Sequence, residues 1–208
     1  MTPLNNDRVS LQVKALSCIR DDRFLFEDLS FLIKGQQVLL LEGKNGSGKT
    51  SLLRILCGFR EPDTGEIYWC GEPLDNQYYA KMVYVGHRDG VKNELTVREN
   101  LMISQALGVA NQLSIEQALL KVGLQGFDDI LVQSLSAGQK RRLSLARLLI
   151  SESILWILDE PFTSLDKAGI AMVESFITEH VEHGGMVIMT SHHDVDLANI
   201  HSHKINLS

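Results

Sequence analysis

Hydrophobic positions form short continuous runs toward both ends of the chain and repeat at three- and four-residue spacing between them. Short apolar runs bounded by turn residues are typical of buried strands, whereas the wider spacing is typical of amphipathic helices. The predicted strands are residues 9–15, 28–33, 37–41, 66–69, 82–85, 154–158 and 187–190. The predicted helices are residues 51–57, 98–107, 136–150 and 167–180, with one more between Ser114 and Gly123.

Two of these helices begin with a recognisable capping signal. Thr96 and Glu99, and likewise Ser114 and Gln117, have the spacing at which a hydroxyl and a carboxyl or amide satisfy each other's free N–H groups. Residues from about 90 to 150 are therefore helical and lie between strand-containing segments, with no linker rich in Pro or Gly. We predict a single α/β domain, residues 1–208, with a helical subdomain at about 90–150.

Composition narrows the class of protein without naming it. The 208 residues suffice for one core, 44% of them are apolar, and the net charge of −6 with no basic block argues against nucleic acid as a partner. No apolar run approaches the roughly 18 residues that span a bilayer, and the first ten residues lack a signal-peptide core. We expect a cytosolic chain that reaches a membrane only through partners, with its three cysteines reduced.

A glycine-rich loop follows the predicted strand 37–41 and precedes the predicted helix 51–57. Its sequence matches the pattern G-x-x-x-x-G-K-[ST], in which backbone N–H groups and a helix N-terminus bind phosphates. Lys49 is expected to reach the β- and γ-phosphates of ATP, and Thr50 to bind Mg²⁺. The alternative is a glycine-rich turn with a chance Lys-Thr pair. The predicted ATP-binding residues are Gly43, Lys44, Asn45, Gly46, Ser47, Gly48, Lys49, Thr50 and Ser51.

Two carboxylates follow the apolar strand 154–158, at the edge of the sheet where a phosphate-binding loop also lies. We expect Asp159 to hold Mg²⁺ through water. We expect Glu160 to act as the general base that polarises the attacking water. The alternative is an ordinary solvated strand end, which the nearby phosphate-binding loop makes less favoured.

A third segment, Leu-Ser-Ala-Gly-Gln at 135–139, opens a helix 20 residues before Asp159. Together with the loop at 43–50 and the carboxylates, it resembles the nucleotide-binding domain of ATP-binding-cassette (ABC) proteins, whose signature is LSGGQ. Residues 164–166 resemble the D-loop of that family, and residues 190–192 its switch-histidine loop. The resemblance covers essentially the whole chain. It implies an α/β P-loop NTPase fold of ABC type, with a mixed central sheet, an antiparallel β subdomain and an inserted helical subdomain.

The resemblance also implies a head-to-tail homodimer that encloses two ATP molecules. Ser136, Gly138 and Gln139 of one chain would then bind the γ-phosphate held by Lys49 of the other. His192 would contact the same phosphate as the switch histidine, with the adjacent His193 as the alternative.

Besides Ala137 in the signature, two departures from the family pattern matter for the site. His87 stands where the family has a Gln that touches Mg²⁺, so His87 is a candidate for both catalysis and metal contact. Arg20 stands where an aromatic ring stacks on adenine, and a planar guanidinium can also stack on a base. Phe24 is the alternative stacking residue.

With these departures, the chain resembles one subfamily, the ATP-binding subunits of the bacterial cytochrome c maturation complex, which is a haem exporter. The resemblance rests on the Gly86-His87 pair within 84–101 and on segments 18–23 and 155–162. It implies a peripheral protein on the cytoplasmic face of the inner membrane, bound to integral-membrane subunits. ATP turnover would energise haem export or release of a haem chaperone, with no haem bound by this subunit. The six histidines of the last third are therefore expected to be solvated surface residues.

Other functions fit the same motifs. Another substrate is possible because the cassette does not touch cargo. An ATPase that acts on nucleic acid or ribosomes is disfavoured by the single cassette, the absence of a long heptad run and the acidic balance. A cassette that binds ATP without hydrolysing it is disfavoured by Glu160 and His192. The groove near residues 87–100, which receives a coupling helix in the family, would discriminate among transport partners.

Overall fold

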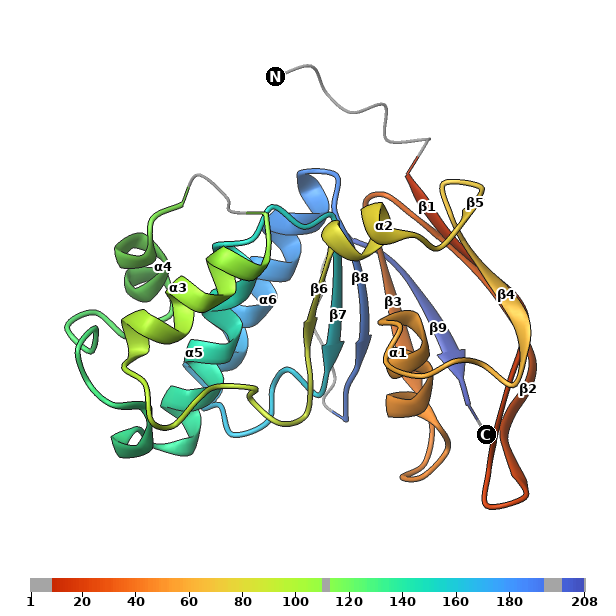
Figure 1. The fold of residues 1–208 in the computed structure, drawn as a ribbon, viewed down its shortest axis with the longest axis horizontal. Helices are drawn as coiled ribbons and strands as arrows, with labels where there is room; N and C mark the ends of the chain where they lie inside the picture. The colour runs from red at the N-terminus through yellow and green to blue at the C-terminus, as the bar shows by residue number, and fades with distance from the viewer. Residues whose placement is uncertain (1–8, 110–112, 193–199, 208) are drawn as a thin grey trace.

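A computed structural model describes residues 9–109, 113–192 and 200–207, which fold into two sheets and six α-helices (Figure 1). The central sheet has the strand order β6 (Met82–Val85), β7 (Leu155–Asp159), β8 (Met186–Thr190), β3 (Gln37–Glu42) and β9 (His201–Asn206). The second sheet has the order β2 (Arg23–Lys34), β1 (Ser10–Arg20), β4 (Thr64–Trp69) and β5 (Glu72–Pro73). The helices are α1 (Lys49–Leu56), α2 (Asn76–Ala80), α3 (Val97–Leu107), α4 (Ile115–Lys121), α5 (Ala137–Leu149) and α6 (Lys167–Glu182).

All described pairings within the central sheet are parallel, so the expectation of a mixed central sheet is wrong for the described strands. The pairings of the second sheet are antiparallel, as expected. Every residue of β7 and β8 is buried, because helices or the second sheet cover both faces of these strands. Along β7, Leu155 and Ile157 join one apolar cluster, whereas Trp156 and Leu158 join the other. This two-residue alternation assigns one face to α1 and the second sheet, and the opposite face to α5 and α6.

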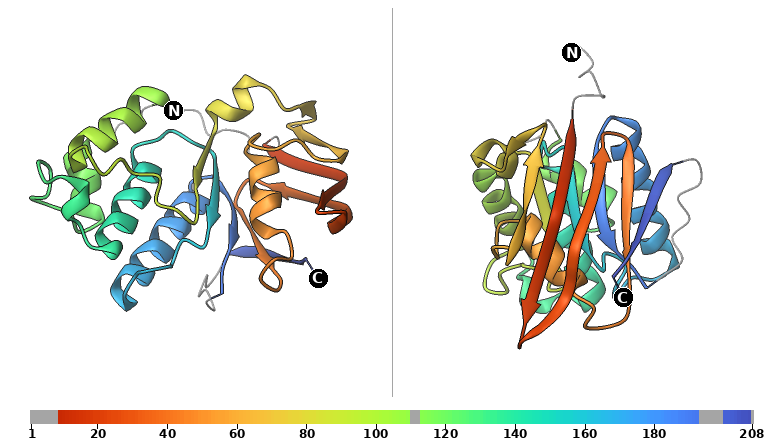
Figure 2. Two further views of the ribbon diagram at one scale, coloured as in Figure 1. Left: turned by 60° about the horizontal axis from the view of Figure 1, so that its bottom comes forward. Right: turned by 90° about the vertical axis from the view of Figure 1, so that its right-hand side faces the viewer.

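Figure 2 shows α1 between the central sheet and the antiparallel sheet. Four α1 side chains are buried in the cluster that contains residues of β1, β7 and β8. This packing fixes the N-terminal end of α1 at the carboxyl ends of β3 and β7.

The predicted helical region is present as α3, α4 and α5, which lie together on one side of the central sheet (Figure 1). The two predicted capping boxes, Thr96 with Glu99 and Ser114 with Gln117, are confirmed. Arg98 binds the carboxylates of Glu116 and Asp128, and so ties the start of α3 to the start of α4 and to the loop that follows α4. No helix within the described ranges is long and apolar enough to cross a membrane.

Four short elements of the described chain were not predicted: α2, β5, β9 and the 3-10 helix η2 (Val132–Ser134). The segment around His201 and His203 contains none of the predicted strands, although both side chains are exposed as expected. It forms β9, which pairs with β3 over six residues although almost all its side chains are exposed. An edge strand held by backbone hydrogen bonds leaves no hydrophobic pattern in the sequence.

The first hairpin is also longer than expected, since β2 begins at Arg23 rather than at residue 28. Asp21 and Asp22 connect β1 to β2 with φ angles of 51° and 56°. Two successive positive φ angles give the hairpin turn whose twist suits the strands. The turn lacks glycine, the residue that makes such turns recognisable in a sequence.

His180 was expected to be a solvated surface residue, and this was wrong as well. Its ring stacks on Trp156 at 3.9 Å between centroids, and Nε2 lies 3.0 Å from the carbonyl oxygen of Ile154. A Cβ atom at Gly185 would lie 2.2 Å from that nitrogen, so a glycine is needed there. Burial lowers the pKa of His180 to about 4, so the ring is neutral when it donates to Ile154.

The partly buried His180 predicts a loss of stability in mild acid. The unfolded chain takes up a proton near the ordinary histidine pKa of about 6.5, whereas the folded chain does so only near 4. The stabilisation is therefore complete above pH 6.5 and is lost progressively down to pH 4. Between about pH 7 and about pH 5 this residue should cost about 2 kcal/mol of the free energy of unfolding, measured by urea titration.

His180→Gln should be less stable at pH 7 and should lose this share of the pH dependence. His183→Gln is the matched control, because His183 is exposed and one helical turn away. Equal pH dependence in wild type and His180→Gln would refute the assignment.

Candidate active site

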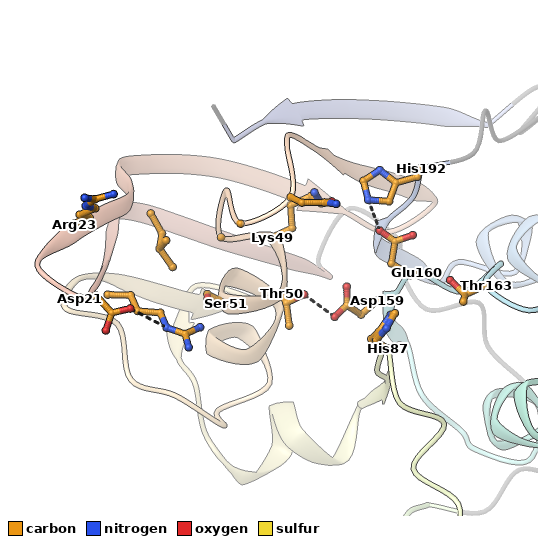
Figure 3. A pocket seen from close by; sticks show the side chains of 15 residues that line it. Asp21, Arg23, Lys49, Thr50, Ser51, His87, Asp159, Glu160, Thr163 and His192 are labelled. Carbon is orange, nitrogen blue, oxygen red and sulfur yellow. Dashed lines mark hydrogen bonds and ion pairs between the residues drawn. The ribbon is translucent and has the colours of Figure 1, made fainter.

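A cavity of about 910 Å³ opens at the carboxyl ends of the central strands (Figure 3). The loop after β3, the ends of β6, β7 and β8, and the hairpin of β1 and β2 all contribute to its wall. The residues that line it are Arg20, Asp21, Arg23, Leu25, Asn45, Gly46, Gly48, Lys49, Thr50, Ser51, His87, Asp159, Glu160, Thr163 and His192. Most of the residues predicted to bind nucleotide from within one chain are therefore brought together.

The loop at 43–48 depends on glycine. Gly43, Gly46 and Gly48 have φ angles of 143°, 84° and 99°, which L side chains rarely adopt. At Gly43 a Cβ atom would also lie 2.4 Å from the carbonyl oxygen of Leu207, at the end of β9. The glycines thus let the backbone curl tightly against the sheet.

The N-terminus of α1 is chemically different from those of the other α-helices in the described part of the chain. Each of the other five has a side chain that accepts a hydrogen bond from the first turn, whereas α1 begins at Gly48 without one. Its first N–H groups and the positive end of its dipole are therefore available to an anion.

Two side chains of the loop add to this anion site. Lys49 is 8% exposed, and its ammonium donates to the carbonyl oxygens of Gly43 at 2.6 Å and Lys44 at 3.2 Å. The buried Oγ of Ser47 has no hydrogen-bond partner among the described residues. A cation held beside an uncapped helix end and an unsatisfied hydroxyl fits a polyphosphate.

Asp159, at the end of β7, is almost fully buried between two hydroxyl groups. Its Oδ2 accepts from Thr50 Oγ1 and its Oδ1 from Thr190 Oγ1, each at 2.8 Å. Asp159 and Thr190 are partners in the ladder between β7 and β8. The adjacent hydroxyl of Thr50 and carboxylate of Asp159 are hard oxygen donors of the kind that Mg²⁺ prefers, so the residues present fit this ion. Thr190 was not singled out as a site residue by the sequence.

Glu160 turns away from β7 into the cavity. Its φ is 54°, a left-handed conformation that costs a non-glycine residue about 1–2 kcal/mol. Its N–H donates to Thr190 Oγ1 at 2.9 Å, and its Oε1 lies 3.1 Å from Nε2 of His192 (Figure 3). The predicted base and the predicted switch histidine are thus in direct contact. His193 lies outside the described residues.

The two departures from the family pattern both line the cavity, at different places. His87 is exposed in the loop after β6, and Figure 3 shows it near Asp159. Arg20 lies at the tip of the first hairpin, paired in register with Arg23, and its Nε is 3.7 Å from the carboxylate of Asp21. Phe24, the alternative stacking residue, is 55% exposed and does not line the cavity. Strand alternation directs it to the face opposite Arg23 and Leu25.

The predicted signature residues do not line this cavity. Ser136 and Gln139 form a capping box at the start of α5. The hydroxyl of Ser136 accepts from the N–H of Gln139 and keeps its own proton to donate elsewhere. A Cβ atom at Gly138 would lie 2.9 Å from the carbonyl oxygen of Ser164, so glycine lets the loop after β7 pack closely on α5.

A parallel sheet, a glycine-rich loop at an uncapped helix N-terminus and a buried carboxylate on an adjacent strand define a P-loop nucleoside-triphosphate-binding protein. The sequence model of the ABC transporter family matches residues 26–163. The chain is 45% identical to the cytochrome c biogenesis ATP-binding export protein CcmA of Photobacterium profundum, over 95% of this chain and 99% of that one. It therefore belongs to the ABC transporter family, among the cytochrome c biogenesis ATP-binding export proteins.

Other matches agree. The protein of the same name from Methylococcus capsulatus is 48% identical, over 90% of this chain and 93% of that one. Among solved structures, a putative ABC transporter ATP-binding protein from Pyrococcus furiosus superposes with a TM-score of 0.81 at 26% identity, over 95% of this chain and 97% of that one. The predicted ABC-type fold and the predicted family are confirmed.

The position of Arg20 predicts a modest contribution to binding of the adenine base of ATP. A guanidinium stacked on a base at an exposed site contributes about 0.5–1 kcal/mol, so Arg20→Ala should weaken ATP binding about two- to fivefold. Inhibition by inorganic phosphate should be unchanged. Fluorescence titration with a labelled ATP analogue measures the affinity. Phe24→Ala is the control, and a larger loss there than in Arg20→Ala would contradict the assignment.

Proposed function

We propose that the chain hydrolyses Mg·ATP in this cavity and that turnover energises haem export, or release of a haem chaperone, in cytochrome c biogenesis. One observation carries the proposal: Lys49, the pair Thr50 and Asp159, and the pair Glu160 and His192 all meet on one cavity. The relatives named above supply the biological setting, since their names state ATP binding, export and cytochrome c biogenesis.

The phosphates would lie across the N-terminus of α1. The ammonium of Lys49 would exchange its carbonyl partners in the loop for phosphate oxygens, which are stronger acceptors. Thr50 and Asp159 would hold Mg²⁺, Asp159 through a water molecule, with His87 as a further contact. The ion, when bound, offsets the negative charge on the phosphates.

Hydrolysis requires a water molecule in line with the γ-phosphate. The carboxylate of Glu160 would orient this water and accept its proton. His192 Nε2, 3.1 Å from that carboxylate, would exchange Glu160 for the γ-phosphate as the acceptor of its N–H when ATP is bound. The left-handed backbone at Glu160 separates its role from that of Asp159, because it directs one carboxylate into the cavity while the other stays buried.

A second copy of the chain would complete the site. Ser136, Gly138 and Gln139 lie off the cavity of their own chain, yet Ser136 keeps a donor proton at a helix N-terminus. A head-to-tail homodimer would bring these groups to the γ-phosphate bound by the partner. Closing over the cavity would also exclude water from the reaction.

We place the homodimer on the cytoplasmic face of the inner membrane, bound to integral-membrane transporter subunits. The segment 87–100 is the proposed docking surface, since it begins at His87 on the cavity and ends in α3. Docking there would link the membrane subunits to the metal end of the nucleotide site.

Glu160→Gln should lower kcat at least about 100-fold, because the water loses its orienting base. Nucleotide binding and ATP-driven dimerisation should persist, because the amide keeps the size of the carboxylate and removes a negative charge near the γ-phosphate. A phosphate-release assay and size-exclusion chromatography with ATP measure these effects. Turnover within a few-fold of wild type would remove Glu160 from the base role.

The same variant tests the biological setting. Tagged Glu160→Gln with ATP should recover small membrane subunits and a haem-loaded chaperone from detergent-solubilised membranes, identified by mass spectrometry and a haem absorption scan. Recovery of a different permease would support ATP-driven transport but would contradict haem as the substrate. Ribosomes or nucleic-acid-processing proteins would discard transport altogether.

His87→Gln separates chemistry from coupling. Since His87 is exposed at the rim near the docking surface, the isolated chain should keep its ATPase rate within about twofold. The rate measured in the membrane complex should change by more than this. A large loss in the isolated chain would instead place His87 in the chemical step.

A further inference from the structure

Arg141 is a buried charged residue that the reaction proposed above does not use. It lies in the second turn of α5, and its side chain is 2% exposed. Nε donates to the carbonyl oxygen of Pro161 at 3.1 Å, and Nη2 donates to those of Asp159 at 3.1 Å and Glu160 at 2.6 Å. Three successive backbone carbonyls after β7 thus converge on one guanidinium.

The same guanidinium also binds the loop after β6. Nη1 donates to the carbonyl oxygen of Gly86 at 2.8 Å and lies 3.4 Å from Oδ1 of Asp89. His87 lies between these two contacts in the sequence. Arg141 therefore joins the segment that carries the proposed base to the segment that carries the metal-side histidine.

Only an arginine can make this set of contacts. Its planar fork presents five N–H donors in fixed directions, whereas a lysine presents three donors at a single point. Burial lowers the pKa of Arg141, while the carboxylates of Asp89, Asp159 and Glu160 oppose the shift. A guanidinium stays charged under such conditions, so all five acceptors face a permanent cation.

The contact with Glu160 is the one with a catalytic consequence. Glu160 has a left-handed backbone that persists only if its surroundings hold it. Thr190 binds its N–H, and Arg141 binds its carbonyl oxygen. The peptide groups on both sides of the proposed base are thereby fixed by side chains from two other elements, β8 and α5.

We propose that Arg141 is a positioning residue for ATP hydrolysis: it holds Glu160 in its strained conformation and fixes the distance between Glu160 and His87. The assignment rests on the proposed role of Glu160. Arg141 does not line the cavity, so its effect should appear in the chemical step and not in nucleotide binding.

Arg141→Lys in the full chain should lower kcat at least about 10-fold, since a displacement of the base by a fraction of an ångström is enough. Its Kd for a non-hydrolysable ATP analogue should stay within about twofold of wild type. Arg98→Lys, assayed without membrane subunits, is the control for loss of a guanidinium, because the partners of Arg98 are the carboxylates of Glu116 and Asp128 in the helical subdomain. Equal loss of kcat and of affinity in Arg141→Lys would overturn the proposal.

A double-mutant cycle separates positioning from general support of the fold. In the Glu160→Gln background, Arg141→Lys should change the residual rate by less than about twofold, because there is no base left to position. The same fold-loss in both backgrounds would overturn the proposal. Wild-type turnover in Glu160→Gln alone would instead refute the assignment of Glu160 as the general base, and would thereby also refute the positioning role of Arg141.

Asp89→Asn keeps the test decisive if Arg141→Lys does not fold. Asp89 is 27% exposed, and its replacement weakens only one contact of Arg141. It should lower kcat several-fold with unchanged analogue affinity and unchanged urea midpoint. An unchanged kcat in this folded variant would overturn the link between the His87 loop and Glu160.

Discussion

The site depends on one buried carboxylate, that of Asp159, held between hydroxyl groups from two different elements. Thr50 reaches it from α1, and Thr190 reaches it from β8. These contacts exist because β7 and β8 run parallel in register and because α1 packs against both strands. A change in the register of β8 by one residue would move Thr190 to the other face of the sheet and leave Asp159 buried with one partner fewer.

Asp159 and Glu160 are adjacent and chemically alike, yet the backbone gives them different surroundings. Asp159 ends a regular strand and stays in the sheet, whereas Glu160 has a positive φ and turns into the cavity beside His192. Thr190 contacts both residues, through the side chain of the first and the N–H of the second. The hydroxyl of Thr190 therefore helps to fix the different orientations of the two carboxylates.

The sequence was sufficient to predict where the glycine-rich loop, the two carboxylates after residue 158, two capping boxes and most central strands lie, because each leaves a local pattern of residue types. It did not predict β9, since that strand is held by backbone bonds to β3 and its side chains face solvent. Nor did it predict the burial of His180, which follows from the approach of Trp156 and Gly185 across elements distant in sequence. Arg141 comes two residues after the signature segment 135–139, and in the sequence it is indistinguishable from a basic residue on the exposed face of a helix. Its five acceptors come from two other segments, so only the folded chain brings them together.

The two ends of the cavity differ in how firmly they are built. At the phosphate end, the side chains of Lys49 and Asp159 are buried. At the hairpin end, the side chains of Arg20 and Asp21 are 66% and 91% exposed, and the described lining residues of the cavity include no Phe, Tyr or Trp. We therefore expect the triphosphate to supply most of the free energy of ATP binding and the adenine base to supply little. Such a division suits a motor whose state is set by the γ-phosphate, because loss of that group on hydrolysis removes contacts at the rigid end of the site.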